Sequence, residues 1–409
     1  MAVAGSIYEE VKGMRKKSLG VFLPIVLLLF GYLVTSSALD SQTHKTVSSY
    51  GIIRYGARAL HTDGRDIKDE AGNVVLLRGV ARGETSYAFS SDYQGWYKHH
   101  EVERDYDRLK SLGVNIVRLA LNPDFWINHA TLPNIDGVVT EYVQLVDDIV
   151  SWCGSKGIYL MLEHHPDISQ AEKAQIFVDP TNWINWLVEL ATRYKNQSHV
   201  SISIMSEPPG HGYCPPPYNT REACSARWRE IASMAIEAIR AVNPNVLIWV
   251  DPAGFVGASL IYDFSGKHLP YSNIVYNMHH YYHSDLGSLV GKDYPPEPYA
   301  VDYWNGNLVV AKQEYEQFLL DYGWKLLAEN VPVVVTEFGV WYPDNNWDVQ
   351  IRDFYDLCRK YGVSWMQWWW HGYWSVNPAT IDYHLLKEDW QTLSPIGEIF
   401  MEELENHQP

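Results

Sequence analysis

The chain has 409 residues, of which 46% are hydrophobic, and a formal net charge of −17 at pH 7. This length and hydrophobic content allow one large α/β domain with a sizeable core. The acidic balance excludes a nucleic-acid partner, because a phosphate backbone demands a basic protein surface. The 17 Trp and 28 Tyr residues supply flat aromatic faces that suit sugar rings as well as a protein core.

The first predicted element is an export segment at the N-terminus. Basic residues within positions 12–17 precede an almost wholly apolar run, Val21–Val34, and small residues follow up to Ala38. This order is typical of a secretory signal peptide that is cleaved after Ala38. A membrane anchor over residues 19–38 is the alternative, since flanking residues could extend the apolar run to span a bilayer. Both interpretations of residues 1–38 predict an extracellular protein, either secreted or anchored to the outer face of the cell membrane.

Residues 39–60 are polar and irregular and predict a linker, whereas residues 61–409 carry the pattern of one folded domain. In that domain Gly72-Asn73 predicts a small β-hairpin over residues 67–75. Short apolar strands then alternate with amphipathic runs. The predicted strands are Val75–Val80, Asn115–Leu121, Tyr159–Glu163, Ser201–Glu207, Val246–Val250, Ile274–His279, Val331–Glu337 and Ser364–Trp370. The predicted helices are Val102–Leu112, Tyr142–Lys156, Trp183–Tyr194, Ala223–Val242, Val310–Glu329, Trp347–Tyr361 and Pro395–Glu403.

This alternation predicts the fold class. Eight short apolar strands, each followed by a helical or loop return, indicate a parallel sheet that is covered on both faces. The predicted fold is therefore an α/β (β/α)₈ TIM barrel, with an open doubly wound sheet as the alternative. The chain contains no glycine-rich nucleotide-binding motif after a strand, so no nucleotide cofactor is predicted.

The four cysteines fall into two kinds. Cys214 and Cys224 bracket a Pro-rich loop, which an exported protein could close with a disulfide. Cys153 and Cys358 lie in helical patterns and are predicted to be buried thiols. None of their spacings resembles a zinc site, and no metal is predicted.

In two stretches a run of residues with high strand propensity leads directly to a glutamate. They are I-S-I-M-S-E-P-P-G at residues 202–210 and V-P-V-V-V-T-E-F-G at residues 331–339. A glutamate at the mouth of a buried strand is costly unless it is paired or hydrogen-bonded. In the first stretch the two prolines end the strand and hold Glu207 in place. Glu337 ends the second stretch. Two strands that each deliver one glutamate predict a single site with two carboxylates.

Other ionisable and aromatic residues follow the predicted strands. In a barrel of this kind the active site lies at the carboxyl ends of the strands. The predicted strand ends carry Arg118 with Asn122, Glu163-His164-His165, Ser206-Glu207, Asp251, His279-His280-Tyr281, Glu337 and Trp368-Trp369-Trp370-His371. So many such groups at one rim favour a functional site over separate structural residues.

Over residues 75–403 the chain resembles the family 5 glycoside hydrolases. These are cellulase-type barrels in which the acid/base residue ends strand four and the nucleophile ends strand seven. The resemblance places Glu207 at the acid/base position and Glu337, in V-T-E-F-G, at the position of the nucleophile. Trp368, in W-M-Q-W, matches the residue that forms the floor of the sugar site beside the cleaved bond.

Further residues match the substrate site of this family. In V-N-I-V-R-L-A-L, Arg118 matches the strand-two arginine that supports the nucleophile. Strand three, Y-L-M-L-E-H-H, supplies His165, with His164 as the off-register alternative. Strand six, N-I-V-Y-N-M-H-H-Y, supplies His279 and Tyr281.

One residue departs from the pattern of the family. The motif Asn-Glu-Pro is Ser206-Glu207-Pro208 in this chain. In the family the asparagine hydrogen-bonds the sugar 2-hydroxyl, and this contact strengthens in the transition state. Because serine is shorter, either the contact is weaker here or the pocket has adapted around Ser206.

The resemblance also implies a mechanism. Carboxyl groups about 5 Å apart give retention of configuration through a covalent glycosyl-enzyme intermediate. Glu207 must then be protonated and Glu337 ionised. Arg118 and Tyr281 are expected to favour the charge on Glu337. Apolar aromatic walls and the negative partner are expected to raise the pKa of Glu207.

These observations predict a retaining glycoside hydrolase that needs no cofactor and cleaves a β-1,4-linked polysaccharide, foremost an endo-β-1,4-glucanase acting on a β-glucan. A β-mannanase or another β-glycan hydrolase is the enzymatic alternative, because subsite loops decide the substrate. A carbohydrate-binding pseudoenzyme is the alternative of another class: Ser206 makes it conceivable, and the presence of both glutamates argues against it. Trp341, Trp370 and Trp374 are candidates for stacking on sugars, and Asp251 is expected to support the site.

Overall fold

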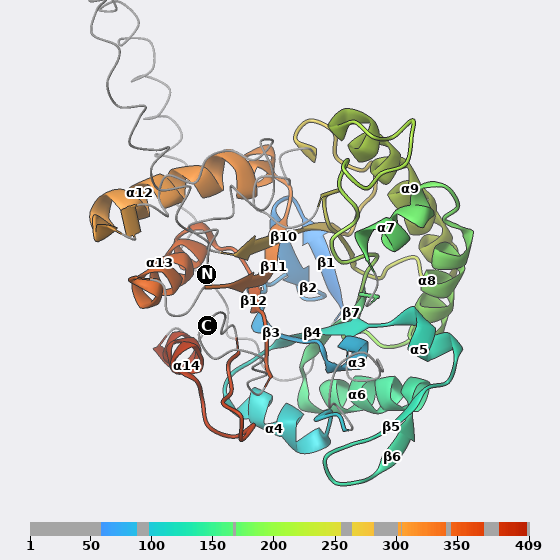
Figure 1. Cartoon of the computed structure of the whole chain (residues 1–409), viewed down its shortest axis with the longest axis horizontal. Helices are drawn as coiled ribbons and strands as arrows, with labels where there is room; N and C mark the ends of the chain where they lie inside the picture. Colours follow the sequence, from blue (N-terminus) through green and yellow to red (C-terminus); the bar gives the residue numbers. More distant parts are fainter. Residues whose placement is uncertain are drawn as a thin grey trace, which may run out of the picture. The chain divides into compact units, whose positions relative to one another are not determined.

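Eight parallel strands form a closed barrel, as the ribbon of Figure 1 shows. The computed structural model describes residues 59–87, 98–166, 169–254, 264–281, 302–303, 305–340, 345–371 and 384–406. The predicted export segment, residues 1–38, lies outside the described residues, as does the predicted linker up to residue 58. The hydrogen-bonded strand order is β10-β11-β12-β3-β4-β7-β8-β9. The strands are β3 (Arg78–Arg82), β4 (Ile116–Leu121), β7 (Tyr159–His164), β8 (Val200–Ser203), β9 (Ile248–Val250), β10 (Ile274–Tyr281), β11 (Val333–Gly339) and β12 (Trp365–Gln367). The predicted (β/α)₈ barrel is confirmed.

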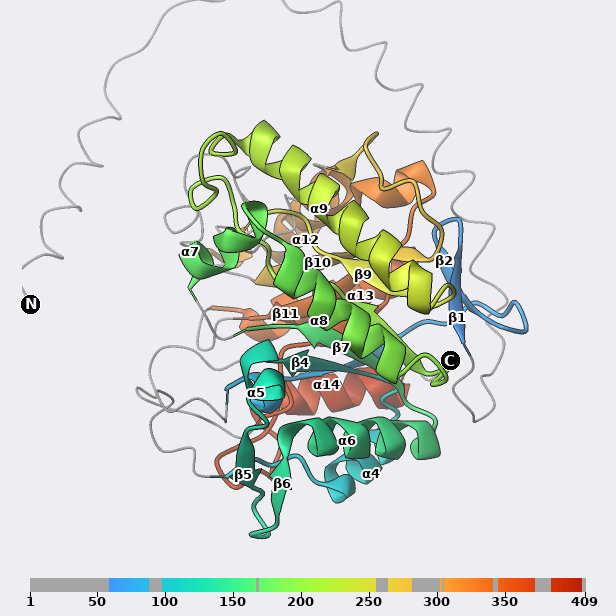
Figure 2. The ribbon, with the colours of Figure 1, turned by 90° about the vertical axis from the view of Figure 1, so that its right-hand side faces the viewer.

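Helices surround the barrel and pack in neighbouring pairs. In the side view of Figure 2, α8 and α9 run side by side, as do α4 and α6. The longer helices are α4 (Glu103–Ser111), α6 (Tyr142–Lys156), α8 (Thr181–Arg193), α9 (Arg221–Val242), α12 (Leu308–Phe318), α13 (Trp347–Tyr361) and α14 (Pro395–Asn406). Short helical segments at the strand ends are α3 (Glu84–Tyr87), α5 (Pro123–Ile127), α7 (Gln170–Lys173) and η2 (Ala174–Phe177). The larger buried cluster lies between the barrel and these helices.

Capping groups define several helix ends. The side chain of Glu141 accepts a hydrogen bond from the Val143 amide at the start of α6. Gly157 takes the left-handed conformation, with φ 64°, just after α6 ends. Glycine adopts this conformation without the steric cost of a Cβ atom. The structure therefore gives α6 the bounds that the sequence predicts.

A β-hairpin closes the amino end of the barrel. Strand β1 (Leu60–Asp63) pairs antiparallel with β2 (Asp66–Asp69). Leu60 and Ile67 join a buried cluster with residues at the beginnings of the barrel strands, such as Ile116 and Tyr159. This hydrophobic plug leaves the carboxyl ends of the strands as the open face of the barrel.

The structure differs from the predicted elements in several places; for example, the strand predicted at Val75–Val80 is β3 at Arg78–Arg82, and the strand predicted at Ser364–Trp370 is the shorter β12. A hairpin turn that the sequence did not predict lies at Gly64, and the predicted turn at residues 72–73 is reduced to an antiparallel bridge between Lys68 and Val74 with backbone hydrogen bonds from Val75 to Ile67 and from Asp69 to Asn73. Strand β8 ends at Ser203, so Ser206 and Glu207 lie in a loop. The predicted helix over residues 310–329 divides into α12, a π-helical segment η4 (Leu319–Gly323) and a 3₁₀ segment η5 (Lys325–Glu329). The sequence did not predict the hairpin of β5 (Thr131–Pro133) and β6 (Val139–Glu141).

The four cysteines behave as predicted. A disulfide joins Cys214 and Cys224, which closes the Pro-rich loop after Glu207. Cys153 and Cys358 are free and buried, and burial raises the pKa of both thiols. In the part of the chain that the structure describes, no helix combines the length and the apolar character that crossing a membrane needs.

The wall of the barrel generates a prediction about stability. A Cβ atom at Gly79 on β3 would lie 1.8 Å from the backbone oxygen of Ile116 on the neighbouring strand. We expect Gly79→Ala to lower the free energy of unfolding by about 1–3 kcal/mol or more, because the two strands must move apart. Gly212→Ala is the matched control, since its Cβ would meet no atom within 4 Å. Urea unfolding measures both variants, and equal stabilities would contradict the packing of β3 on β4.

Candidate active site

A buried arginine organises the carboxyl ends of the strands. Arg118 on β4 has 0% of its side chain exposed. One terminal nitrogen donates to Glu337 Oε2 at 2.5 Å, and the other forms an ion pair with Glu163 Oε2 at 2.5 Å. The second nitrogen also donates to Ser206 Oγ at 3.1 Å. Although burial alone would lower the pKa of Arg118, the charges of Glu163 and Glu337 raise it.

Glu163 is a member of the site to which sequence reasoning assigned no role. Ser203 Oγ donates to its carboxylate at 3.1 Å, and His165 Nδ1 lies 3.2 Å from it. Burial would raise the pKa of Glu163, but the charge of Arg118 lowers it to about 2. The register could have identified this residue, because Ala120 pairs with Glu163 and shares a strand face with Arg118. A buried arginine needs a carboxylate within reach on the same face.

Glu337 lies within β11 and is held by donors on the neighbouring strand β10 and on β4, across the barrel. Its Oε2 accepts from Arg118 at 2.5 Å, and its Oε1 accepts from the Tyr281 hydroxyl. His279 on β10 is the register partner of Glu337. The predicted contacts of Arg118 and Tyr281 with this carboxylate are therefore present in the structure.

Glu207 follows β8 in an unusual backbone conformation. Its φ is 48°, in the left-handed region that a residue with a side chain seldom adopts. The Glu207 amide donates to Asp251 Oδ2 at 3.0 Å, so Asp251 supports the site as expected. The Glu207 carboxylate then reaches His279 Nδ1 at 3.0 Å.

Despite burial, the positive charge of His279 lowers the pKa of Glu207, which the sequence predicts to be raised. Burial would lower the pKa of His279, but Glu337, Asp251 and the hydrogen bond to Glu207 raise it to about 9. Burial raises the pKa of Glu207, but the hydrogen bond and the positive charge of His279 outweigh burial and lower it. The predicted rise in the pKa of Glu207 is therefore wrong. These opposite shifts favour the proton on His279 over the proton on Glu207 in the unliganded site.

The two carboxylates and His279 form a compact cluster. One side-chain donor or acceptor atom from each of Glu207, His279 and Glu337 lies within 4.8 Å of the other two. Two carboxylates and an imidazole of this spacing could hold a divalent cation. A metal ion would have to displace the proton that the raised pKa of His279 favours, whereas proton transfer uses it. The residues therefore fit proton transfer better than they fit metal binding.

Aromatic rings form one wall beside the carboxylates. The rings of His165 and Trp368 are stacked with centroids 5.7 Å apart, and His165 Nε2 lies 2.8 Å from the Tyr87 hydroxyl. The Arg118 guanidinium carbon lies 5.3 Å from the centroid of Trp368. Trp369 stacks on Trp368 with a centroid distance of 4.8 Å. The structure thus brings His165 and Trp368 together with the arginine and its carboxylates.

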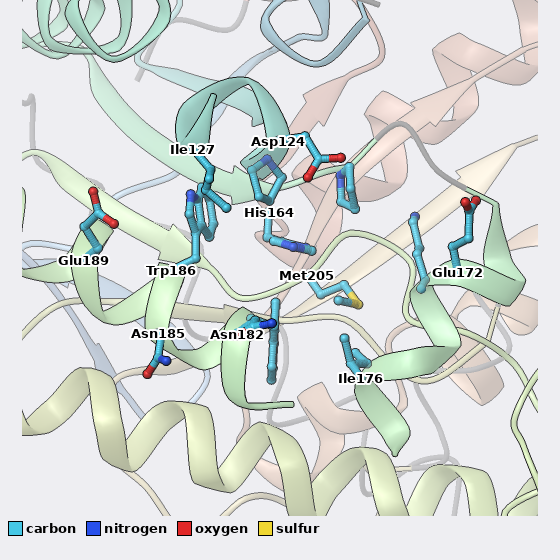
Figure 3. Close-up of a pocket in the computed structure, with 14 residues that line it drawn as sticks. Asp124, Ile127, His164, Glu172, Ile176, Asn182, Asn185, Trp186, Glu189 and Met205 are labelled. Atoms are coloured by element: carbon cyan, nitrogen blue, oxygen red, sulfur yellow. The ribbon is translucent and has the colours of Figure 1, made fainter. Parts of the chain in front are cut away.

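Some of the predicted candidates lie elsewhere. His164 lines a separate cavity of about 470 Å³ with Trp183 and Trp186 (Figure 3), so the off-register alternative to His165 is wrong. His280 is 1% exposed and packs between aromatic side chains such as Tyr315. Trp370 is 1% exposed and cannot stack on a sugar, contrary to expectation. The other two candidates for stacking lie outside the described residues: Trp341 and Trp374.

Comparisons with known sequences place this site in a family. A family model described as cellulase, glycosyl hydrolase family 5, matches residues 69–373 of the chain. An endoglucanase of Paenibacillus polymyxa is 24% identical over 411 aligned positions, which cover 93% of each chain. The major extracellular endoglucanase of Xanthomonas campestris pv. campestris is 28% identical over 203 positions, which cover 46% of this chain and 39% of that protein.

Solved structures share the fold. The catalytic domain of the major endoglucanase of Xanthomonas campestris pv. campestris superposes with a TM-score of 0.61 at 20% identity, and the match covers 85% of this chain and 100% of that one. An endocellulase of Pyrococcus horikoshii in complex with cellotetraose gives a TM-score of 0.61 at 19% identity, covering 85% of this chain and 99% of that one. At these identities the likeness shows the barrel fold.

The raised pKa of His279 predicts how stability depends on pH. The pKa rises from an ordinary value of 6.5 to about 9 on folding. Its contribution to the free energy of unfolding is therefore complete below pH 6.5 and is lost as the pH rises through about 9. This loss amounts to at most about 3 kcal/mol.

Denaturant unfolding between about pH 6 and pH 10 tests this expectation. The variant His279→Gln should lose the decline in this window, because it has no titrating group at this position. A wild-type curve with the same slope as the variant would show that His279 is not held as a cation.

Proposed function

The chain belongs to glycosyl hydrolase family 5, the cellulase family, and we propose that it is a retaining endo-β-1,4-glucanase whose catalytic pair is Glu207 and Glu337. The observation that carries the proposal is the approach of the two carboxylates, which have oxygens within 4.8 Å of each other at the open end of the barrel. A retaining glycosidase needs carboxyl groups about 5–5.5 Å apart, whereas an inverting one needs room for a water molecule between them.

Glu337 is proposed to attack the anomeric carbon. Arg118 and Tyr281 each donate to one of its two oxygens, which fixes the plane of the carboxylate. Attack through one oxygen forms a glycosyl ester and neutralises Glu337. The arginine stays paired with Glu163 throughout the reaction.

Glu207 is proposed to protonate the leaving oxygen, with His279 as the store of the proton. In the free enzyme Glu207 and His279 form an ion pair at 3.0 Å. A sugar that covers the pair removes water, and a low dielectric favours the neutral partners over the ion pair. Transfer of the Nδ1 proton then gives Glu207 the acid form that the glycosylation step requires. After the step, Glu207 is again a carboxylate and can activate the hydrolytic water.

The wall of His165 and Trp368 is proposed to carry the sugar next to the cleaved bond. An indole face offers a pyranose ring a flat apolar surface beside the ionic groups. The similarity to two endoglucanases, those of Paenibacillus polymyxa and Xanthomonas campestris pv. campestris, supports a β-1,4-glucan as the substrate. The cellotetraose in the Pyrococcus horikoshii structure supports the same assignment.

The proposal includes the export of the chain. Residues 1–38 are proposed to be a signal peptide or an outer-face anchor, residues 39–60 a linker, and residues 61–409 the catalytic domain. The apolar run before Ala38 supports export, as does the similarity to the major extracellular endoglucanase of Xanthomonas campestris pv. campestris. The disulfide between Cys214 and Cys224 fits an oxidising compartment.

The two carboxylates should respond differently to mutation. Glu337→Gln is expected to lower kcat on a soluble β-1,4-glucan by about 10⁴-fold or more, because no nucleophile remains. Glu207→Ala should keep slow cleavage of a 2,4-dinitrophenyl β-cellobioside, since this leaving group needs little acid assistance. Azide should then accelerate turnover of Glu207→Ala and leave a β-cellobiosyl azide.

The control is Glu222→Ala, which removes an exposed glutamate at the start of α9 and should show no response to azide. An α-cellobiosyl azide, or full activity of Glu337→Gln, would refute the retaining assignment. A panel of β-1,4-glucan, mixed-linkage β-glucan, mannan and xylan distinguishes a glucanase from a mannanase by the release of reducing sugar.

Ser206→Asn tests whether the site has adapted to serine. Ser206 is 1% exposed and its hydroxyl already accepts from Arg118 at 3.1 Å. We expect the larger asparagine to disturb this contact and to lower kcat/KM by about tenfold. Assays on an aryl β-cellobioside and on its 2-deoxy analogue measure the effect. A gain in activity that appears only with the 2-hydroxyl present would show instead that Ser206 is an unadapted replacement.

A further inference from the structure

A buried lysine lies behind the proposed acid/base residue. Lys173 ends the short helix α7, and only 5% of it is exposed. Its amine donates to the backbone oxygen of Ser206 at 3.2 Å. Burial lowers the pKa of Lys173, whereas the charges of Glu207 and Glu163 oppose this effect. A buried ammonium group is costly, so its position next to this loop calls for a reason.

The oxygen that accepts from Lys173 and the amide of Glu207 belong to one peptide group. The amide end of that group donates to Asp251 Oδ2 at 3.0 Å. A cation therefore contacts the negative end of the peptide dipole, and an anion contacts the positive end. Hydrogen bonds to charged partners are stronger than neutral ones. The two side chains form a clamp that resists rotation of this peptide group.

The backbone at Glu207 needs such a clamp. Strand β8 ends at Ser203, so no strand ladder holds the peptide that follows Ser206. The left-handed φ of 48° at Glu207 is unfavourable for a residue with a Cβ atom. Backbone conformations of this kind persist only where the surroundings over-determine them. Rotation of the clamped peptide would turn the Glu207 carboxylate away from His279.

We propose that Lys173 is a positioning residue for the acid/base step, because with Asp251 it clamps the Ser206–Glu207 peptide and thereby aims the Glu207 carboxylate at the leaving oxygen. The inference rests on the proposed function of Glu207. The Lys173 amine donates to the backbone oxygen of Ser206, so Lys173 is proposed to act through the backbone that carries Glu207.

The cavity beside Lys173 makes the inference testable by chemical rescue. Lys173 lines the cavity of about 470 Å³. In Figure 3 the side chains of His164 and Met205, which line this cavity, lie near the centre of the view, and Glu172 lies toward its right-hand side. Its lining includes Ile127, which is 61% exposed, so the cavity opens to solvent. A small amine from solution can therefore reach the space that a shortened side chain leaves.

The first experiment measures kcat/KM of Lys173→Met on two substrates. Loss of the clamp should lower kcat/KM about 10- to 100-fold on 4-methylumbelliferyl β-cellobioside, which needs acid assistance. The change on the 2,4-dinitrophenyl substrate should stay within about threefold, because that leaving group needs little proton transfer. Lys110→Met is the matched control, since Lys110 also donates to a backbone oxygen, that of Gly157 at 3.3 Å, on another side of the barrel.

The second experiment adds amines to Lys173→Ala. Propylammonium replaces the atoms that this variant lacks. It should raise the kcat/KM of the variant on the 4-methylumbelliferyl substrate by about tenfold or more. Tetramethylammonium has no N–H donor and should restore nothing. Because the readout is a gain of activity, it also distinguishes positioning from a general loss of folded protein.

Equal losses on both substrates in Lys173→Met, or unchanged activity on both, would overturn the inference. Equal rescue by propylammonium and tetramethylammonium would also overturn it. Either result would refute the role of Lys173 alone, provided that Glu207→Ala still cleaves the 2,4-dinitrophenyl substrate and still forms the β-cellobiosyl azide. The proposed function of Glu207 would then stand. If Glu207→Ala lacked both, the proposed function itself would fail.

Discussion

The site depends on the burial of one guanidinium group. Arg118 lies inside the barrel with none of its side chain exposed, and its charge must be balanced by carboxylates that are equally withdrawn from water. Glu163 on β7 and Glu337 on β11 meet this need from two different strands. Three strands of the barrel are thereby tied to one cation. The same contact that ties β11 to this cation also fixes the position of the Glu337 carboxylate.

Around this centre, positive and negative side chains are matched over a short distance. Three cationic groups face four carboxyl groups: Arg118, His279 and Lys173 against Glu163, Glu207, Glu337 and Asp251. The carboxyl groups outnumber the cations by one. Burial, together with the charge of Glu163, raises the pKa of Asp251 to about 6. His279 instead binds a proton firmly and holds Glu207 as a carboxylate. The free site thus stores its proton on the histidine, one hydrogen bond away from the group proposed to deliver it.

Local patterns were enough to predict the eight strands, α6 and the two glutamates, because apolar runs, capping residues and breaking prolines act within a few residues. The properties that depend on neighbours across the barrel were not predicted. The place of Glu163 in the site follows from its register with Ala120 on the neighbouring strand. The place of Lys173 follows from the position of α7, which brings its amine to the backbone oxygen of Ser206. The lowered pKa of Glu207 requires the position of His279, which is distant in the sequence. Trp370 is a tryptophan like Trp368 and lies two positions away, yet it is buried in the core.

The most direct test of the account is to identify the residue that becomes bonded to the sugar. In 2-deoxy-2-fluoro-β-cellobiosyl fluoride the 2-fluoro group slows both steps, and the good leaving group at the anomeric carbon speeds the first, so that a glycosyl-enzyme accumulates. Mass spectrometry of the digested protein then locates the added cellobiosyl group. The account predicts a single label on the peptide that contains Glu337. A label on Glu207, or no label on an enzyme that still hydrolyses β-1,4-glucan, would contradict it.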